Sequence, residues 1–377
     1  MHGSSHSLFG LVEGLRLRGV EVVMAVPICW KQDDDFDNCA KKLDVRLYRI
    51  QLEHTRDNSG WTRRPWHFRT FLRNAKFMIS RKIESYHSIC TVIEREHPDV
   101  VHTNVGIIHE GYWAARKFKI PHVFHLREYQ DKDFGWNILP SKRVFSMLLR
   151  QSAAVITITN DIRYHFYQHK NPNALTIYNG VFSINDASFI LSKEKYFLCA
   201  SRISHEKGLI DVITAFSDFH QTQPDYKLMI AGDGDKHYIE TLKQTACSLG
   251  CMDDVCFVGF SQNVKSLMQH ATALIVGSYN EGFGRMTAEA AFQGCLIIGR
   301  NTAGTKEILD CVGGYPFMSI DELRSNMNAI IKLSPEEYRQ KAISAQKIAI
   351  ENYSKEQYVE KVYNVYKSLL NNNTHNT

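Results

Sequence analysis

Two glutamates, Glu281 and Glu289, lie eight positions apart on either side of a glycine-containing turn. An apolar run precedes the turn and predicts a buried strand, and the small residues after it are typical of a helix. Gly282 and Gly284 allow the backbone to approach a ligand closely, and the start of the helix directs free N–H groups at that ligand. Because amides suit a phosphate and carboxylates suit hydroxyl groups, the segment predicts a nucleotide-sugar site. The alternative is an ordinary strand–loop–helix crossover with two solvated glutamates.

Three further segments carry residues suited to a diphosphate or to the turns around one. Residues 199–208, Cys-Ala-Ser-Arg-Ile-Ser-His-Glu-Lys-Gly, place Arg202 and Lys207 directly after a predicted strand. The turn at residues 231–235 and the strand at residues 255–260 follow in the same half of the chain. A guanidinium and an ammonium can stabilise the charge that develops on a departing nucleoside diphosphate. The alternative for this pair is two surface cations.

These four segments, in this order, resemble those of the retaining GT-B glycosyltransferases known as the GT4 family. The resemblance is strong from about residue 196 to residue 310 and thin before residue 100. It implies two Rossmann-like α/β domains whose parallel sheets face a central cleft, and sugar transfer from a nucleotide sugar with retention at the anomeric carbon. Ser201 replaces the glycine that the family has before the arginine.

The resemblance also implies roles for single residues. Glu281 would accept hydrogen bonds from the transferred sugar, supported by the amides of Phe283 and Gly284, and Glu289 would bind the ribose. Either glutamate could instead interact with a helix dipole. The predicted catalytic residues are His125, Arg202, Lys207 and Glu281; the predicted donor-binding residues are Arg202, Lys207, Gly232, Val258, Glu281, Gly282, Phe283, Gly284 and Glu289; and the predicted acceptor-side residues are Gly3, Ser4, His102 and Glu128.

His125 lies at the end of a predicted strand in the first half of the chain. Resembling enzymes have a histidine here whose imidazole or backbone contacts the sugar or assists the acceptor. His122 is a competitor, and a strand-end histidine can also be purely structural. His102 and Asn104, after the preceding strand, and Glu128 are further candidates for the acceptor side.

Length and composition favour a two-domain intracellular protein. The chain has 377 residues, 44% of them hydrophobic and 23% charged, with a net charge of +5. No apolar run approaches the ~20 residues of a membrane-spanning helix, and the N-terminus has no secretory layout. The nine cysteines are scattered without a C-x-x-C, which favours a reducing compartment. We therefore expect a cytoplasmic protein, either free or peripheral at the inner face of the plasma membrane.

Strand-like and helix-like stretches alternate along the chain, which predicts parallel sheets with crossover helices. We expect an acceptor-side domain at residues 1–185, a nucleotide-sugar domain at residues 186–352, and a C-terminal helix from residue 353 that crosses back to the first domain. The first domain begins at a glycine-containing loop where the family has a strand. A missing first strand, a late start codon and a vector-derived leader remain open as explanations.

No metal-ligand cluster is evident, because the acidic run Asp33–Asp35 lies in a polar loop, so neither a metal nor another cofactor is expected. Aromatic and basic residues interleave between Trp61 and Lys82 without an acid. Such a segment suits an anionic lipid surface, and no nucleic-acid-binding signature accompanies it. The alternative is a partly buried helix with a solvated basic face. The lipid interpretation implies an acceptor carried on a polyprenyl diphosphate or a glycolipid.

The predicted function is therefore a retaining hexosyltransferase that acts on a glycan or lipid-linked acceptor in cell-surface polysaccharide synthesis, of the lipopolysaccharide O-antigen or capsule type. Two alternatives remain. A nucleotide-sugar 2-epimerase of the same fold would need further acid–base carboxylates facing the sugar, and none can be assigned. A non-catalytic two-lobed sugar-binding protein would not need Arg202, Lys207 and Glu289 together. The sequence does not distinguish a UDP-sugar from a GDP-sugar or another nucleotide sugar.

Overall fold

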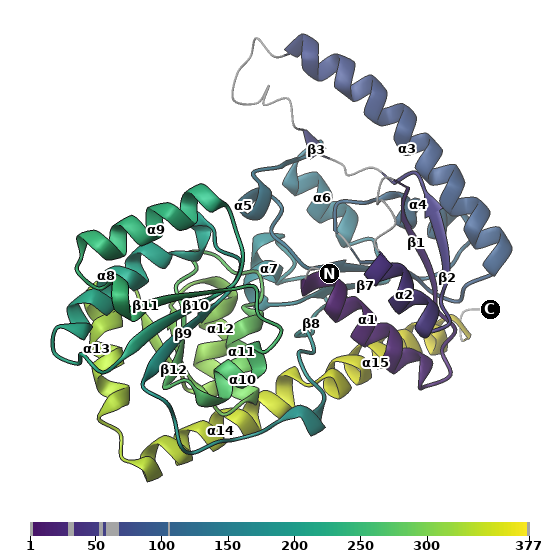
Figure 1. Ribbon diagram of the computed structural model, residues 1–377. Coiled ribbons are helices and arrows are strands. Elements are labelled where there is room, and N and C mark those ends of the chain that lie inside the picture. The colour runs from purple at the N-terminus through teal and green to yellow at the C-terminus, as the bar shows by residue number, and fades with distance from the viewer. Residues whose placement is uncertain (1–2, 29–33, 53–55, 58–67, 105, 375–377) are drawn as a thin grey trace. The chain divides into compact units, whose positions relative to one another are not determined.

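The computed structural model describes residues 3–28, 34–52, 56–57, 68–104 and 106–374 (Figure 1). The chain divides into two compact units. Unit 1 comprises Met1–Gly180 and Tyr358–Thr377, and unit 2 comprises Val181–Gln357. These boundaries lie at residues 180 and 357, against the predicted 185 and 352.

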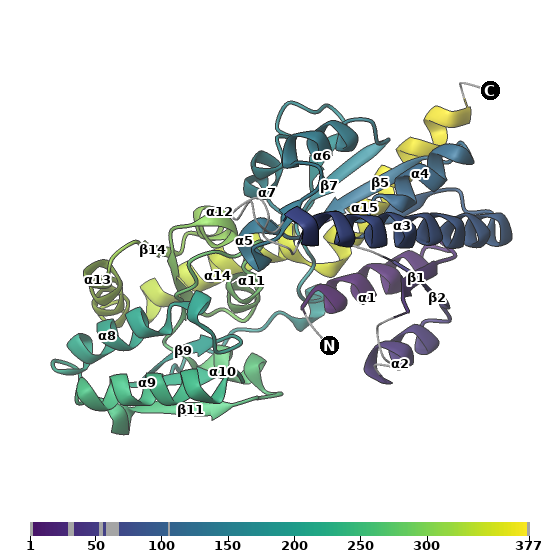
Figure 2. The same ribbon diagram turned by 90° about the horizontal axis from the view of Figure 1, so that it is seen from above.

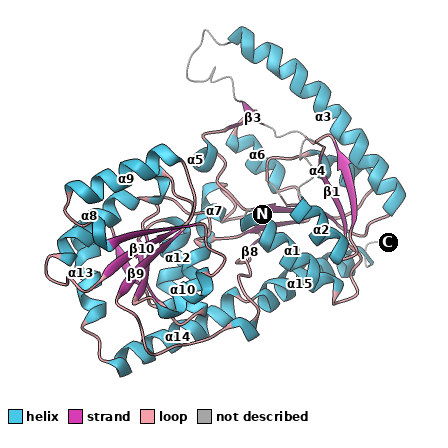
Figure 3. Cartoon of the chain, in the orientation of Figure 1, coloured by secondary structure: helices cyan, strands magenta, loops and turns pink. Residues whose placement is uncertain are grey.

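Unit 2 alternates strands and helices, as Figure 3 shows. Its elements are η2 (Ile184–Asp186), β9 (Tyr196–Ala200), η3 (His205–Lys207), α8 (Leu209–His220), β10 (Lys227–Ala231), α9 (Lys236–Ser248), η4 (Met252–Asp254), β11 (Val255–Gly259), α10 (Val264–His270), β12 (Ala273–Val276), α11 (Arg285–Phe292), β13 (Leu296–Arg300), α12 (Ala303–Val312), β14 (Tyr315–Phe317), α13 (Ile320–Ile331) and α14 (Pro335–Tyr353). The six strands form one parallel sheet in the order β11-β10-β9-β12-β13-β14.

The sheet of unit 2 is covered on both faces, which explains why its strands read as continuous apolar runs. Alternate strand residues such as Phe197, Cys199 and Ile230 join a core with α8, α9 and α13. Their neighbours point to the other face, where α11 packs against β12 and β13 and is flanked by α10, α12 and α14. The parallel α/β fold predicted from the alternation is thus confirmed in this unit.

Unit 1 has shorter strands. Its elements are α1 (Gly3–Arg16), β1 (Val23–Pro27), α2 (Asp34–Lys42), β2 (Arg46–Ile50), β3 (Arg56–Asp57), α3 (Phe68–Glu96), β4 (Val101–Thr103), α4 (Glu110–Lys117), β5 (His122–Leu126), α5 (Asp131–Phe134), β6 (Asn137–Ile138), α6 (Lys142–Leu149), β7 (Ala154–Thr157), α7 (Asn160–His165) and β8 (Ala174–Thr176). The described parallel strands form two sheets, β1-β2 and β4-β5-β7-β8, and β3 and β6 form an antiparallel pair.

The C-terminal helix α15 (Lys355–Thr374) completes the core of unit 1. Tyr358, Val359 and Val362 are buried in one cluster with residues of α1, β5 and β7. Helices α1 and α15 meet at Gly14, where a Cβ atom would lie 2.4 Å from the Val359 side chain. Figure 2 shows both helices from above. Residues more than 300 positions apart therefore share one apolar core.

Candidate functional site

The sheet of unit 2 has a topological switch point between β9 and β12. From β9 the chain proceeds to β10 and β11 on one side, and it returns to β12, β13 and β14 on the other. In open α/β sheets a ligand binds beyond the carboxyl ends of the strands at such a point. The loop after β9 carries Arg202 and Lys207, and the loop after β12 carries Glu281. The order of the strands thus brings two of the predicted segments to one place.

The loops after β9 and β12 are in direct contact. Gly208 has φ +61°, and a Cβ atom there would lie 2.3 Å from the carbonyl oxygen of Gly277. The amide of Tyr279 donates to the carbonyl oxygen of Glu206 at 3.0 Å. Glycine is required at residue 208 both by the left-handed conformation and by this close approach.

Lys207 and Glu281 form an ion pair across these two loops. The Lys207 ammonium lies 2.6 Å from a carboxylate oxygen of Glu281, and both side chains are mostly buried. Arg202 behaves differently, because its guanidinium lies 3.0 Å from Glu206 and its side chain is 73% exposed. The structure therefore brings Lys207 and Glu281 together and leaves Arg202 at the solvent edge of the same loop.

The start of α11 follows Glu281 within the same loop. Gly284 has φ +80° and precedes the first helical residue, as a ligand-facing turn before a helix requires. The amide of Gly304 donates to the carbonyl oxygen of Glu281 at 2.9 Å, which fixes the loop against the start of α12. Phe283 is buried and its ring lies 5.9 Å from that of Tyr353, while Gly282 lies in the turn between. The Phe283 side chain therefore anchors the loop, and the Glu281 carboxylate remains partly exposed.

Glu289 lies one turn further along α11 and is held by Arg285, to which sequence reasoning gave no role. The Arg285 Nε atom lies 2.6 Å from a Glu289 carboxylate oxygen. A second nitrogen of Arg285 donates to the carbonyl oxygen of Val181 at 3.2 Å. Burial raises the pKa of Glu289, and the Arg285 guanidinium opposes that rise. The four-residue spacing of the pair was visible in the sequence as a helical ion-pair pattern.

The two remaining donor-side candidates lie in different places. Gly232, after β10, has φ +150°, and a Cβ atom there would lie 1.8 Å from the carbonyl oxygen of Ser201. Its role is therefore to let the β10 turn approach the loop that carries Arg202. Val258 lies in β11, the edge strand, and is 39% exposed. Because β10 separates β11 from the switch point, Val258 is not brought together with Lys207 and Glu281.

In unit 1, polar side chains converge near the carboxyl ends of β4 and β5, with His102 in β4 and His125 in β5. The His102 Nε2 and His125 Nδ1 atoms lie 3.2 Å apart. Next to them the buried Arg127 guanidinium donates to the side-chain oxygens of Asn104, Asn179 and Tyr358 at 2.8, 2.6 and 2.6 Å. Sequence reasoning gave no role to Arg127 or to Tyr358.

Both histidines at this edge are neutral. Burial lowers the pKa of His102 to about 3, with a further contribution from the Arg127 guanidinium. Burial also lowers the pKa of His125 well below its ordinary value. The structure thus places His102, His125 and Asn104 in one hydrogen-bonded group.

The other acceptor-side candidates either lie outside this hydrogen-bonded group or have side chains outside the described residues. Burial raises the pKa of Glu128, with a further contribution from Asp133, and the side-chain amide of Gln130 donates to a Glu128 carboxylate oxygen at 3.4 Å. Gly3 and Ser4 lie at the start of α1, and the Ser4 side chain is outside the described residues. Of the three aspartates from Asp33, only Asp35 has a described side chain.

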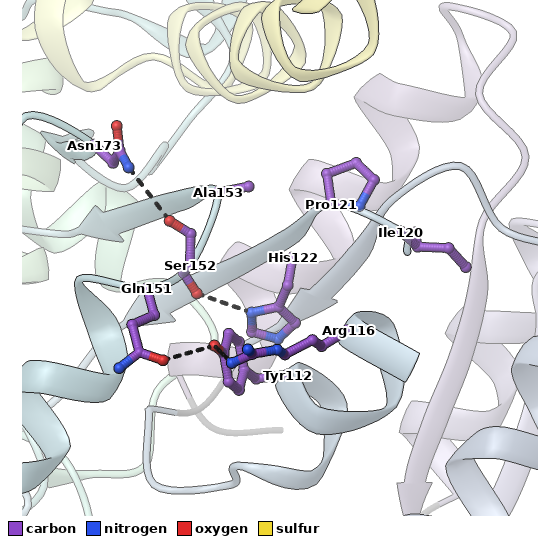
Figure 4. A pocket seen from close by; sticks show the side chains of 9 residues that line it. All are labelled: Tyr112, Arg116, Ile120, Pro121, His122, Gln151, Ser152, Ala153 and Asn173. Atoms are coloured by element: carbon purple, nitrogen blue, oxygen red, sulfur yellow. Dashed lines mark hydrogen bonds between the residues drawn. The ribbon is translucent and has the colours of Figure 1, made fainter. Parts of the chain in front are cut away.

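A cavity of about 620 Å³ lies at the opposite edge of the unit 1 sheet (Figure 4). It is lined by Tyr112, Arg116, Ile120, Pro121, His122, Gln151, Ser152, Ala153 and Asn173. Tyr112 and Arg116 belong to α4, and the other lining residues lie at or just before the first residues of β5, β7 and β8, away from the carboxyl ends. The His122 ring nitrogens are bonded to Thr103 at 2.8 Å and Ser152 at 3.2 Å. His122 is therefore a satisfied core residue, apart from the group around His125.

Within the part of the chain that the structure describes, no group of three His, Cys, Asp or Glu residues is placed to hold a metal ion. None of the described helices has the length and apolar character needed to span a bilayer. Of the aromatic and basic segment between Trp61 and Lys82, side chains are described only from Lys76 onwards. The remainder of that segment lies outside the described residues.

Comparison with known proteins identifies related families over most of the chain. Residues 183–348 match the family described as "Glycosyl transferases group 1", and residues 2–180 match the "Glycosyl transferase 4-like domain". The alpha-monoglucosyldiacylglycerol synthase of Streptococcus pneumoniae is 26% identical over 53% of this chain and 51% of its own length. The N-acetyl-alpha-D-glucosaminyl L-malate synthase of Bacillus anthracis is 23% identical over 74% of this chain and 77% of its own length. The chain thus spans about half of the first relative and about three quarters of the second.

The fold is also found in solved structures. HepE of Anabaena, in complex with UDP, has a TM-score of 0.77 and 19% identity, over 97% of this chain and 96% of that protein. The same protein in complex with UDP-glucose gives a TM-score of 0.74. At this level of identity the likeness concerns the fold, and it confirms the predicted architecture.

Proposed function

Because the chain belongs to the glycosyl transferases group 1 family of GT-B glycosyltransferases, we propose that it moves a hexosyl group from a UDP-sugar to a hydroxyl group of a glycan or lipid-linked acceptor. The observation that carries this proposal is the Lys207–Glu281 pair at the switch point of unit 2, next to the start of α11. The HepE complexes with UDP and UDP-glucose support uracil as the base of the donor nucleotide.

The donor would bind by exchanging one ion pair for two interactions. A diphosphate that enters beside Lys207 competes for its ammonium, and the start of α11 adds amide donors. Glu281 then loses its partner, and its carboxylate is free to accept hydrogen bonds from sugar hydroxyls. The ion pair of the free protein therefore keeps both residues in place until the donor replaces it.

Transfer would proceed with retention, on the same face as the leaving group. The bond between the anomeric carbon and the diphosphate oxygen breaks, and a bond to the acceptor oxygen forms. The acceptor hydroxyl proton passes to the departing diphosphate. Lys207 and Arg202 would stabilise the negative charge on that diphosphate as it leaves. No step requires a covalent intermediate with the protein.

The acceptor is proposed to be carried at an anionic membrane face, as part of cell-surface polysaccharide synthesis. The support comes from α3, where Ile79 and Ile83 lie one turn apart and are 57% and 54% exposed. Lys76 is exposed on the same face of the helix. Exposed aliphatic side chains next to a basic residue suit the interface of an anionic bilayer.

The donor half of the proposal is tested by incubating the protein with a panel of nucleotide sugars and measuring released nucleoside diphosphate, with and without a lipid extract. We expect release from a UDP-sugar, stimulated by the extract, and loss of release in Lys207→Ala. An epimerase would instead convert the sugar without releasing UDP, and a binding protein would leave the nucleotide sugar intact. Either result would reject the transferase proposal.

The membrane half is tested with a variant in which Arg63, Arg64, Arg69 and Arg73 are neutralised together. Each basic residue near an anionic surface contributes about 1 kcal/mol, so binding to anionic vesicles should fall by more than about a hundredfold. The difference in vesicle binding between the variant and the parent should decrease as the salt concentration rises, because electrostatic attraction to the surface is screened within roughly 8–10 Å. Co-sedimentation of this variant equal to that of the parent at low salt would mean that the acceptor need not be a lipid.

A further inference from the structure

The two neutral histidines of unit 1 are joined to the C-terminal helix by a continuous chain of hydrogen bonds. The Tyr366 hydroxyl on α15 lies 2.5 Å from the Nδ1 atom of His102. On the other side of the ring, the His102 Nε2 atom lies 3.2 Å from the His125 Nδ1 atom. Because both rings are neutral, one proton lies between the two facing nitrogens, and either ring could carry it.

Arg127 determines which ring carries that proton. A guanidinium has five donors and no acceptor, and its Nη2 atom lies 3.5 Å from the His125 Nδ1 atom. The His125 Nδ1 atom thus faces a donor from Arg127 and a ring nitrogen from His102. A proton on this nitrogen would point at the guanidinium N–H, so the favourable assignment is a lone pair that accepts from both.

The remaining protons follow from this assignment. His102 donates from Nε2, and its Nδ1 atom accepts from the Tyr366 hydroxyl. Burial raises the pKa of Tyr366, which keeps that hydroxyl a donor. His125 must then carry its proton on Nε2. From the Tyr366 hydroxyl on α15, the two hydrogen bonds of this chain therefore donate in sequence to His102 in β4 and to His125 in β5.

The Nε2 atom of His125 is buried and has no hydrogen-bond partner among the described residues. A buried N–H group without an acceptor is costly, and native proteins rarely leave one unpaired. An oxygen atom of a bound ligand would satisfy it. The orphaned nitrogen is a second observation, independent of the hydrogen-bond chain, that this end of β5 receives a ligand.

We propose that Tyr366, His102 and Arg127 are positioning residues that hold His125 as the neutral Nε2–H imidazole, so that it donates a hydrogen bond to a carbohydrate oxygen and does not act as a base. The identity of the ligand as a carbohydrate rests on the proposed function. The tautomer and its dependence on α15 rest on the geometry of unit 1 alone.

The tautomer can be read directly from the protein labelled with ¹⁵N-histidine. Long-range ¹H–¹⁵N correlations distinguish a protonated from an unprotonated ring nitrogen, and the signal absent from His125→Gln identifies His125. We expect a protonated Nε2 and an unprotonated Nδ1 on His125, unchanged between about pH 6 and pH 8, because the ring is neutral throughout this range. A protonated Nδ1, or a cationic ring in this range, would overturn the proposal. This measurement needs no donor, so its failure is distinct from failure of the proposed function.

The dependence on α15 is tested with Tyr366→Phe, which removes the hydroxyl and keeps the ring. We expect the His102 ring signals to change and kcat to fall about tenfold, the equivalent of one hydrogen bond, with less than a twofold change in the donor KM. Tyr363→Phe is the matched control, because it removes a hydroxyl from the same helix at a ring whose centroid lies 6.0 Å from the Arg18 guanidinium. If Tyr366→Phe matches this control in both spectrum and kcat, α15 has no positioning role.

Discussion

Replacing Arg285 with leucine should make nucleotide binding and stability respond to pH in opposite directions. Arg285 is the charged group that opposes the burial-driven rise in the pKa of Glu289. Without it, burial acts alone and the pKa of Glu289 rises further. The carboxyl group then stays protonated over a wider range of pH, whereas the proposed contact with the ribose hydroxyls uses the ionised form.

The size of the binding effect follows from the contacts of the carboxylate. An ionised Glu289 can accept hydrogen bonds from two ribose hydroxyls, whereas a protonated carboxyl group offers fewer acceptors. A hydrogen bond to a charged group contributes about 1.5–3 kcal/mol, so UDP affinity in Arg285→Leu should fall between roughly tenfold and a hundredfold at low pH. The loss should shrink as pH rises through the new pKa of Glu289.

The effect on stability has the opposite sign. A carboxyl group whose folded pKa lies above its unfolded value binds more protons when folded, so the free energy of unfolding decreases as pH rises. Leaving a buried charge without its partner costs about 3–5 kcal/mol, and the lower end applies because Arg285 is itself 24% exposed. The variant should therefore lose about 3 kcal/mol at high pH and much less at low pH.

Calorimetric titration with UDP and urea unfolding, each at about pH 6 and pH 8, would measure both trends. Because the nucleotide's own phosphate titrates near 6, each variant is compared with the parent at the same pH. Arg285→Lys retains the charge and should behave like the parent, and Arg285→Leu with Glu289→Gln should bind weakly without the added pH dependence. If Arg285→Leu binds UDP as tightly as the parent at the lower pH, Arg285 does not control Glu289.

Lys207→Ala should lower turnover by roughly a hundredfold, the effect of losing one donor to the leaving group, and an unchanged rate would place the diphosphate elsewhere. Glu281→Ala should lower kcat more than UDP affinity, because only groups near the developing charge bind the transition state more tightly than the ground state. If calorimetry finds a loss of UDP affinity and kcat is unchanged, Glu281 does not stabilise the transition state. Gly232→Ala should lower the free energy of unfolding by at least ~2 kcal/mol, because its new Cβ atom would lie 1.8 Å from the Ser201 carbonyl oxygen. Gly250 has φ +70° with open space around it, so Gly250→Ala should lower the free energy of unfolding by less in the same urea titration. Equal losses in the two variants would show that the close approach of Gly232 to the Ser201 carbonyl oxygen does not matter for stability.

The sequence predicted the strands of unit 2 more closely than those of unit 1, for a physical reason. A strand buried on both faces must be apolar along its whole length, so runs such as residues 272–278 and 295–299 are evident without other information. β2 (Arg46–Ile50) has two arginines within five residues and therefore shows neither a continuous apolar run nor a strict alternation, and it was not predicted. The short β3 and β6 have too few residues to show any period.

The candidate site was predictable where a ligand contact depends on the backbone or on residues within one loop. Gly284 and Glu281 belong to a single turn, so their types and spacing are informative. The contact between Tyr366 and His102 joins residues 264 positions apart, and the tyrosine reads only as one of several apolar positions on a helix. The Arg285–Glu289 spacing was visible, but the buried environment of Glu289 depends on α14 and the sheet. Long-range packing, and not residue type, determines these roles.

The shared core of α1 and α15 has a consequence for the order in which the protein can fold during synthesis. Residues 181–357 form a unit whose sheet and helices are all available once residue 357 has left the ribosome. Unit 1 begins earlier, yet its core around Leu11 and Ile156 lacks Tyr358, Val359 and Val362 until the last stretch of the chain is made. Domains usually fold in the order in which they are translated. Here the unit that is translated first is completed last, and its apolar surface remains uncovered until α15 arrives.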